Sequence, residues 1–200
     1  MKKITYIIIP VILIIIIFTF IGNDESSEQY IDRINKERAE KDEYMKTSAA
    51  SPFKEDPAAF KGLNYFAPNQ DFKVTAKITK FDTQQYVTIA ESDGSSKKYL
   101  KFAKADFMIK NQPGQLLLLK QTGFGNLNVI FTGFTDETSG ILTYGGGRYL
   151  DLEFKNADKI TIDFNQAYNP YCEYNETFSC PFPPRENHIP IAIEAGEKNY

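Results

Sequence analysis

Ligands for transition metals are scarce in this sequence. Its 200 residues include one histidine, two cysteines and no tryptophan. Because haem groups, iron–sulfur clusters and zinc sites are held largely by histidine and cysteine, we predict no metal site and no cofactor. Basic residues are also too few to dominate, since 23 Lys and Arg stand against 26 Asp and Glu, a formal net charge of -3. Such a surface does not attract a phosphate backbone, so we expect no nucleic-acid partner.

The longest apolar run lies at the N-terminus. Residues 4–21 contain 15 apolar residues and no charged one, and Lys2 and Lys3 precede them. This length is at the short end of what crosses a bilayer, and the lysines place the following chain outside the cytoplasm. The alternative is a cleaved signal peptide, although no small-residue cleavage motif follows. We therefore assign residues 1–22 to a membrane anchor or signal segment, with the membrane as a partner through residues 4–21.

Both alternatives export the rest of the chain. The expected location is the bacterial cell envelope, with the domain anchored on the extracytoplasmic side, or secreted or periplasmic if the signal is cleaved. Without residues 1–22 the chain keeps 21 basic and 26 acidic residues, a net charge of -5. A surface of that charge is not drawn to anionic lipid headgroups.

A charged helix is expected next. Residues 25–46 contain no Pro or Gly and are rich in Glu, Lys, Arg and Gln, which favour helix. Ser26 or Ser27 is a suitable N-cap. We interpret residues 23–47 as a charged helical spacer; a helix that docks one thin apolar stripe on the domain, or a short self-pairing coil, are the alternatives. The remaining residues 48–200 are expected to form a single β-rich domain.

From residue 72 onward the periodicity is that of β-strands. Residues 72–78 alternate between apolar and polar, turns are expected at residues 82–83 and 113–114, and Asp-Gly at 93–94 predicts a hairpin. Residues 116–119 are continuously apolar, which indicates burial on both faces. About nine short segments at roughly ten-residue spacing predict a mainly β fold, either an antiparallel β-barrel or a sandwich.

Several strings in this part of the chain are specific enough to indicate a family. They are SPF at 51–53, FKGLNYF at 60–66, DETSG at 136–140, TYGGGRYL at 143–150, DFNQAYNPYC at 163–172, CPFPPREN at 180–187 and AGE at 195–197. Over about residues 48–200 the chain resembles domain of unknown function family 1684, a set of uncharacterised bacterial and archaeal proteins. The resemblance implies an exported or anchored single domain and brings no established reaction or cofactor.

The two cysteines lie close together in the sequence. Cys172 and Cys180 enclose seven residues, and in an exported domain such a pair is expected to form a disulfide. His188 follows at the same spacing, so a metal site completed by Asp163 or Glu186 is one alternative, although structural zinc sites use shorter spacers. A nucleophile pair of Cys172 and His188 is another.

Residues 143–171 supply candidates for a ligand site. Residues 145–148 can form a backbone nest in which Arg148 holds an anionic group, or simply a tight crossing between two strands. Residues 163–171 resemble a networked polar turn that lines a site, or alternatively a structural corner joined by Asx-type hydrogen bonds. The candidate ligand-binding residues are Tyr144, Arg148, Asp163, Asn165, Tyr168 and Asn169.

Two functions of different class follow. The first is a membrane-tethered, extracytoplasmic β domain that binds a small ligand, a glycan or an envelope partner. The second is an envelope hydrolase in which Asp163, Glu186 and Asp136 are the candidate catalytic carboxylates and Arg148 holds an anionic group of the substrate. The hydrolase requires Arg148, Asp163 and a second carboxylate to converge on one pocket.

Overall fold

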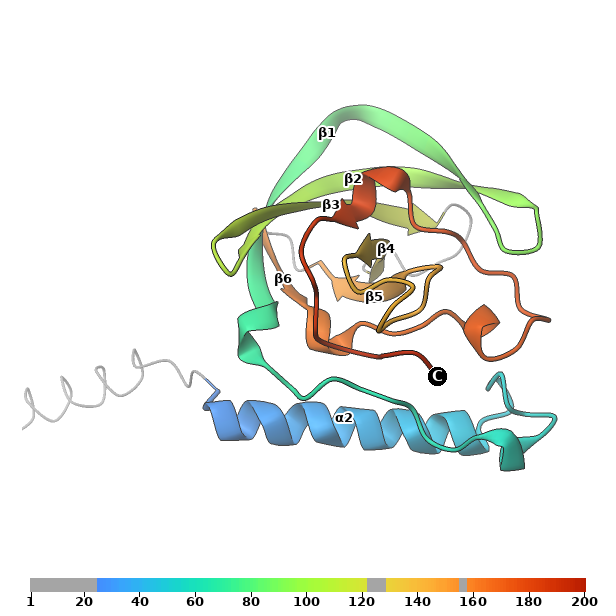
Figure 1. Ribbon diagram of the computed structural model, residues 1–200. Helices are drawn as coiled ribbons and strands as arrows, with labels where there is room; N and C mark the ends of the chain where they lie inside the picture. Colours follow the sequence, from blue (N-terminus) through green and yellow to red (C-terminus); the bar gives the residue numbers. More distant parts are fainter. Residues whose placement is uncertain (1–24, 122–128, 155–157) are drawn as a thin grey trace, which may run out of the picture.

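The structure, a computed structural model, describes residues 25–121, 129–154 and 158–200. A seven-stranded sheet curls into a nearly closed barrel, and helix α2 (Ser27–Thr47) lies along its outside (Figure 1). The predicted anchor at residues 1–22 lies outside the described residues. Within the part of the chain that the structure describes, no helix is both long and apolar enough to cross a membrane.

The sheet is antiparallel except at one short strand. Its strands are β1 (Lys73–Ala90), β2 (Ser96–Ile109), β3 (Gln112–Gln121), β4 (Val129–Asp136), β5 (Arg148–Glu153), β6 (Lys159–Asp163) and β7 (His188–Ile189). The order is β5-β4-β3-β2-β1-β6, and β7 pairs in parallel with β4. Because the end strands β5 and β6 approach each other, the sheet comes close to closure. The predicted mainly β, antiparallel fold is confirmed, and its form is the barrel.

Short 3₁₀ helices mark the irregular parts of the chain. They lie at Pro57–Ala59, Gln70–Phe72, Phe164–Gln166, Tyr171–Glu173 and Arg185–Asn187. Three of them follow β6, in a segment rich in proline, which restricts the backbone. This segment returns across the outside of the barrel, where Glu91 and Tyr149 each form an isolated bridge with it.

The main core fills the barrel. Its members alternate along the strands and are almost fully buried, and they include Ala76, Ile78, Ala103, Ala105, Leu116, Leu118, Ile130, Leu150 and Ile162. A smaller cluster lies on the opposite face of the sheet and consists of Ile89, Tyr99, Leu117 and Leu119. The run 116–119 is therefore buried on both faces, as its lack of alternation predicted.

Strand β1 is longer than its sequence suggests. The turn predicted at residues 82–83 is wrong, since the strand continues through this point to Ala90. Its pairing with β2 shifts register between Lys80 and Gln85 instead. A bulge of this kind accommodates extra residues without reversing the chain.

The turn between β2 and β3 also differs from its prediction. It lies at Lys110 and Asn111, whose φ angles of 47° and 64° are both positive. Because Ile109 pairs directly with Gln112, these two residues form the whole loop, which is the geometry of a type I′ hairpin. Residues 113–114, predicted as the turn, lie at the start of β3, where a proline is tolerated.

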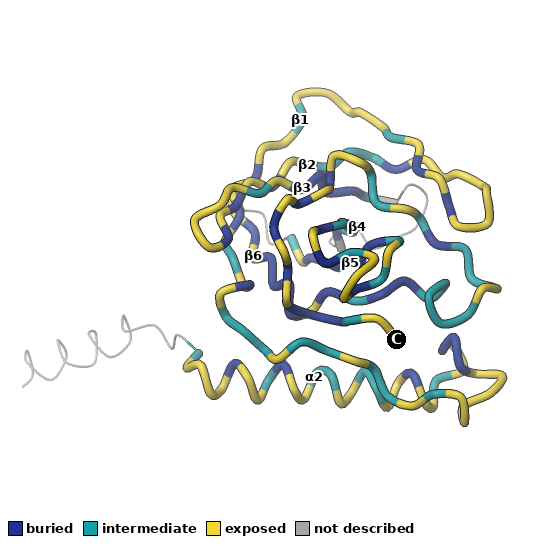
Figure 2. The backbone as a smooth tube through the Cα atoms, in the orientation of Figure 1, coloured by how far each residue is buried: buried dark blue, intermediate teal, exposed yellow. Residues whose placement is uncertain are grey.

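Helix α2 begins with a reciprocal pair of hydrogen bonds. The Ser26 hydroxyl accepts from the backbone N–H of Gln29, and the Gln29 side chain accepts from the backbone N–H of Ser26, so Ser26 is the N-cap. Figure 2 shows buried residues recurring along the helix among exposed ones, and these are Tyr30, Ile34 and Met45. Of the alternatives for this segment, the docked helix with a thin apolar stripe is the one observed.

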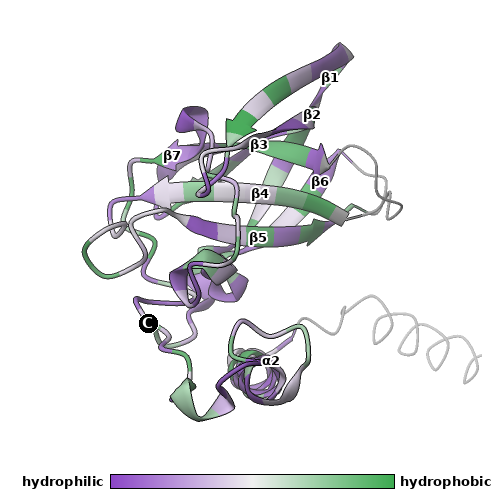
Figure 3. Ribbon diagram, turned by 90° about the vertical axis from the view of Figure 1, so that its right-hand side faces the viewer, coloured by the Kyte–Doolittle hydropathy of each residue, from purple (hydrophilic) through white to green (hydrophobic). Residues whose placement is uncertain are grey.

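The C-terminal end of the chain lies between the barrel and α2, which Figure 3 shows with the helix seen end-on. Polar contacts also hold α2 against the rest of the domain. The Arg38 guanidinium donates to the backbone oxygens of Phe66 at 2.8 Å and Asn165 at 3.4 Å. Asp42 accepts from the backbone N–H of Leu63 at 3.3 Å. The helix is therefore held by directed hydrogen bonds as well as by apolar burial.

The glycine run at residues 145–147 is a tight crossing into β5. Gly147 has a φ of +89°, and a Cβ atom there would lie 2.6 Å from both the backbone oxygen of Phe134 and Cγ of Pro183. Its N–H donates to the backbone oxygen of Tyr144 rather than pointing to a ligand. The conformation and the crowding both require glycine at this position.

We predict that Gly147→Ala lowers the free energy of unfolding by about 3 kcal/mol, because it adds a steric clash to backbone strain. Gly94→Ala is the matched control, since Gly94 has a similar φ of +84° but open space around it. Its strain alone should cost about 1 kcal/mol. Urea denaturation measures both values, and equal losses would show that crowding at Gly147 has no energetic role.

Candidate ligand-binding pocket

A cavity of about 760 Å³ opens between α2, the sheet and the segment that follows β6. Helix α2 contributes Lys41 and Tyr44, and the remaining wall comes from Glu91 after β1, from strands β2 to β5 and from residues 168–181. We call this cavity the aromatic pocket because of the rings that line it. They are Tyr44, Tyr99, Phe131, Tyr149, Tyr168, Tyr171 and Phe178.

Four of these rings form a continuous wall. The centroids of Tyr99 and Phe131 lie 6.2 Å apart, those of Phe131 and Tyr149 4.8 Å, and those of Tyr149 and Tyr168 5.8 Å. Tyr99, Phe131 and Tyr149 belong to three different strands, so the rigid sheet fixes their spacing. Contacts of this kind, one stacked and two edge-on, hold the rings in place.

A buried carboxylate lies behind one edge of the pocket. Glu91 is 3% exposed, and its Oε1 atom lies 2.9 Å from Nζ of Lys97. Its other oxygen accepts from the hydroxyls of Ser95 at 3.3 Å and Ser179 at 3.0 Å. The hydrogen bond to Glu91 raises the pKa of Lys97. The ammonium group at this edge is therefore already paired.

A second buried carboxylate joins the pocket to the helix. Glu197 is 1% exposed, and Nζ of Lys41 lies 2.6 Å from its Oε1 atom and 4.4 Å from the ring centre of Tyr168. Its Oε2 atom accepts from the Asn169 backbone N–H at 2.7 Å and from the Tyr174 hydroxyl at 2.5 Å. Burial, together with the Glu197 charge, raises the pKa of Tyr174 above its ordinary value. Asn169, a predicted ligand residue, thus helps to fix Glu197.

A smaller cavity of about 320 Å³ lies between α2 and the barrel and shares Lys41 and Tyr168 with the aromatic pocket. Arg38 lines this cavity, and the Cζ atom of its guanidinium lies 4.5 Å from the ring centre of Tyr65. Burial lowers the pKa of Arg38. The helix is therefore joined to the barrel without filling the space between them completely.

Arg148, predicted to hold an anionic ligand, is fully buried. Its Nη2 atom donates to Asp136 Oδ2 at 2.9 Å and to the backbone oxygen of Ile193 at 2.9 Å. Its Nη1 atom donates to the backbone oxygens of Ala195 and Glu197, the latter at 3.1 Å. Burial lowers the pKa of this guanidinium, and the Asp136 charge opposes that effect. The side chain binds the C-terminal segment instead of a ligand.

Asp136, a predicted catalytic candidate, belongs to the same network. Its Oδ1 atom accepts from the backbone N–H of Thr138 at 2.8 Å, from the Thr138 hydroxyl at 2.7 Å and from the backbone N–H of Ile193 at 3.2 Å. With Oδ2 occupied by Arg148, both oxygens of the carboxylate are engaged inside the protein. We call Asp136, Arg148 and the backbone of residues 193–197 the arginine network.

Asp163 and Asn165 form the structural corner that was one of the two interpretations. Both oxygens of Asp163 accept from the Tyr30 hydroxyl, at 2.9 and 3.1 Å, and Oδ1 also accepts from the backbone and side chain of Asn165. Asn165 in turn exchanges two hydrogen bonds with the backbone of Asn69, each of 2.8 Å. Burial and the Asp163 charge raise the pKa of Tyr30. This carboxylate fastens the helix to the barrel.

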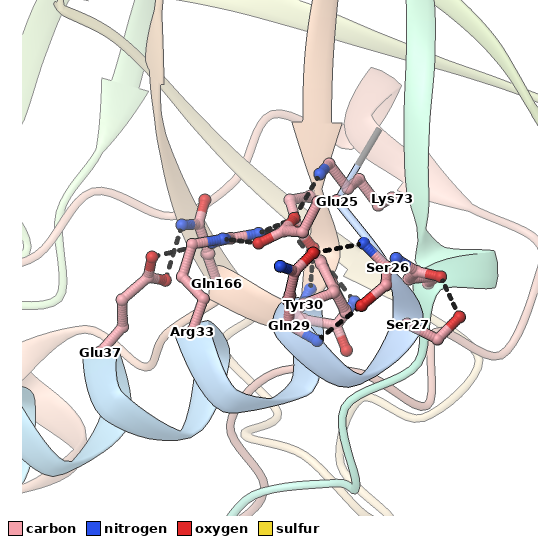
Figure 4. A network of polar contacts seen from close by, with 12 residues as sticks. Glu25, Ser26, Ser27, Gln29, Tyr30, Arg33, Glu37, Lys73 and Gln166 are labelled. Carbon is pink, nitrogen blue, oxygen red and sulfur yellow. Dashed lines mark hydrogen bonds and ion pairs between the residues drawn. The ribbon is translucent and has the colours of Figure 1, made fainter. Parts of the chain in front are cut away.

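Figure 4 shows the same end of α2 from close by. Arg33 donates to Glu25 at 2.7 Å and to Glu37 at 2.8 Å, and Lys73 of β1 lies 3.3 Å from Glu25. Gln166 donates to Glu37 at 3.0 Å. Arg33 also lies 3.8 Å from Asp163, so these contacts add to the Tyr30–Asp163 bond at this end of the helix.

The third catalytic candidate lies elsewhere. The Glu186 side chain is 54% exposed, and its carboxylate lies 3.5 Å from Nζ of Lys101. Arg148 binds Asp136, Asp163 binds Tyr30, and Glu186 faces solvent, so these side chains lie in separate networks. The hydrolase hypothesis requires these side chains to converge on one pocket, and they do not.

Cys172 and Cys180 are free thiols, so the predicted disulfide is not supported. The backbone N–H of Cys172 donates to Sγ of Cys180 at 3.3 Å. The intervening loop is held without a covalent link, because Asn175 accepts from Thr177 and donates to the backbone oxygen of Pro52. Burial raises the pKa of Cys180 to about 12, which disfavours its reactive thiolate form.

Tyr144 and His188 complete the predicted set. Burial, and then the neighbouring Cys172, raise the pKa of Tyr144 to about 12. His188 lies 3.1 Å from the hydroxyl of Thr135 and 3.4 Å from the carboxylate of Glu137, so its neighbours are not the cysteines. Among the described residues, no group of three or more His, Cys, Asp or Glu side chains is arranged to hold a metal.

Of the six predicted ligand residues, Tyr168 lines the aromatic pocket, whereas the buried Glu91 and the helix residues Lys41 and Tyr44 were missed. One signal was available for the sheet part of the wall. Lys97 and Tyr99 are two residues apart in the predicted strand and therefore share a face, but the sequence does not indicate which segment covers that face.

We predict that Arg148→Met lowers the free energy of unfolding by roughly 3–5 kcal/mol, since it leaves Asp136 and three backbone oxygens without their donor. Arg185→Met is the matched control, because Arg185 is exposed and should cost less than about 0.5 kcal/mol. Chemical denaturation of both variants tests this difference. Similar stabilities of the two variants would contradict a structural role for the arginine network.

The comparisons with known proteins agree with the fold. The family model described as "Protein of unknown function (DUF1684)" matches residues 58–198. The chain is also similar to a solution NMR structure, that of the uncharacterized protein from gene locus rrnAC0354 of Haloarcula marismortui, with 36% identity over 88% of this chain and 97% of that chain and a TM-score of 0.67. No curated protein matches. The chain therefore belongs to the DUF1684 family, which its sequence strings had indicated.

Proposed function

We propose that the protein is a membrane-tethered, extracytoplasmic domain that binds a small ligand in the aromatic pocket. The observation that carries this proposal is the pocket itself, a cavity of about 760 Å³ with an aromatic wall and a few fixed polar groups. Ligand sites in proteins commonly combine these features. The half-buried rings of Phe131, Tyr171 and Phe178 offer apolar surface that a flat ligand or a sugar ring would cover.

Binding is favoured over hydrolysis by the state of the charged groups. The carboxylates of Asp136 and Asp163 are 3% and 6% exposed and already accept several hydrogen bonds each. A catalytic acid or base must instead reach the proton that it transfers. The aromatic pocket therefore supports recognition of a ligand, with a glycan or an envelope partner as the larger alternatives.

The proposed tether rests on the sequence in front of α2. Residues 4–21 are almost entirely apolar, and only a few residues separate them from the helix that docks on the barrel. With Lys2 and Lys3 on the cytoplasmic side, the domain would face the cell envelope close to the membrane surface.

We expect Lys104→Cys in the full chain to react with a membrane-impermeant maleimide in intact cells, because Lys104 is exposed on the proposed extracytoplasmic domain. Lys2→Cys is the matched control and should react only after lysis, and the native chain gives the background from its own cysteines. Labelling of Lys104→Cys only after lysis would contradict the proposed topology.

Tyr44 provides a test of the pocket that spares the fold. It is 42% exposed and lines the pocket, whereas Tyr86, which is 44% exposed, lies over Lys98 and does not line it. Using naphthylmethanol as a flat, uncharged probe, we expect Tyr44→Ala to weaken binding to the full chain about five-fold and Tyr86→Ala to leave it unchanged.

NMR titration measures this binding through changes in the chemical shifts of the residues that line the pocket. Partition of the probe into lipid or detergent does not produce these changes. Both variants should keep their stability within about 0.5 kcal/mol, since both side chains are exposed. Absence of probe-dependent shifts at pocket residues of the native chain, or an equal loss in both variants, would overturn the proposed binding site.

A further inference from the structure

We infer that the aromatic pocket selects uncharged ligands, because the charged side chains around it already have partners within the protein. This inference rests on the proposed function and names its ligand class: flat molecules that carry hydroxyl or amide groups and no net charge. Volume and aromatic rings alone would admit organic ions as well. The distribution of charge decides between these classes.

Two ammonium groups at the pocket edges, those of Lys97 and Lys41, are each paired with a buried carboxylate. Lys97 lies 2.9 Å from Glu91, and Lys41 lies 2.6 Å from Glu197. Both carboxylates are almost fully buried, so an anionic ligand cannot easily displace them from their lysines. An anionic ligand would therefore approach two neutral ion pairs instead of two cations. The Coulomb attraction that it gains there would not offset the hydration that it loses on entering the pocket.

The remaining charged groups have partners too. Asp151 is exposed, and its Oδ2 atom accepts from the Tyr168 hydroxyl at 2.8 Å. The Lys120 ammonium lies 4.4 Å from the ring centre of Phe102. These groups still offer hydrogen bonds to a neutral ligand. Since Lys41 and Lys97 are already paired with carboxylates, a cationic ligand would meet the Asp151 carboxylate together with the Lys120 ammonium. These two opposite charges leave a cation without a net Coulomb attraction to offset its desolvation.

A neutral ligand gains from the same arrangement. Its flat face covers the rings of Phe131, Tyr171 and Phe178, and its hydroxyl or amide groups bond to the edges of the ion pairs. Hydrogen bonds to charged groups are stronger than those between neutral groups, and the neutral ligand loses less hydration than an ion on entering the cavity. The ion pairs thus act as fixed polar contacts and do not require a ligand of opposite charge.

Three probes of nearly equal shape test the inference on the full chain: naphthylmethanol, naphthoate and naphthylmethylammonium. We expect the uncharged probe to bind about ten-fold more tightly than either ion, as measured by NMR titration of pocket residues. An ion that binds as tightly as naphthylmethanol would overturn the inference and leave the proposed binding site intact. If none of the three shifts pocket residues, the proposed binding function fails and the inference fails with it.

One substitution should convert the pocket to anion binding. Glu91→Gln removes the partner of Lys97 while keeping a side chain that can bond to Ser95 and Ser179. We expect the affinity for naphthoate to rise about five-fold relative to that for naphthylmethanol. Glu186→Gln is the matched control, because it also removes the carboxylate partner of a lysine, Lys101, but outside the pocket.

The control should leave all three affinities as they are. An affinity of Glu91→Gln for naphthoate that is unchanged relative to that for naphthylmethanol, in a variant that keeps the native NMR spectrum, would show that Lys97 is not neutralised by Glu91 and would contradict the inference. If Glu91→Gln does not fold, the ranking of the three probes on the native chain still decides the question.

Discussion

The buried bond between Arg148 and Asp136 is the interaction on which the other parts of the structure depend. It joins β5 to the end of β4, and the same guanidinium holds the backbone oxygens of Ile193 and Glu197. Because the backbone of Glu197 is fixed by these bonds, its side chain is positioned to form the ion pair with Lys41 of α2. One buried cation in the barrel thus determines the course of the C-terminal segment, and that segment determines where the helix and one wall of the pocket lie.

A charged group in this position imposes a constraint as well as a contact. A guanidinium out of water is unfavourable unless its donors are bonded, so this part of the chain has few alternative conformations. The helix follows the same principle on a smaller scale, since Tyr30 bonds to Asp163 at one end and Lys41 to Glu197 further along. Directed polar bonds therefore fix the position of α2 on the barrel, which its thin apolar stripe alone would not determine.

These long-range bonds also explain which features could be predicted from the sequence. The antiparallel β fold, an N-cap at Ser26 or Ser27 and the double burial of residues 116–119 follow from local patterns and were predicted correctly. The partners of Arg148 and Asp163 were not predicted, because a polar residue looks the same in the sequence whether its side chain faces a ligand or a buried partner. The partner of Asp163 lies 133 residues away, and nothing in the local sequence connects the two.

The position of α2 has a consequence for the energetics of the whole protein. Lys41 and Tyr44 reach the pocket wall only while the helix is docked, so a molecule bound there favours the docked form over any form in which the helix has separated. Ligand concentration and helix attachment are then linked quantities. Any ligand of this pocket would therefore change how firmly α2 is held against the barrel, although the two are far apart in the sequence.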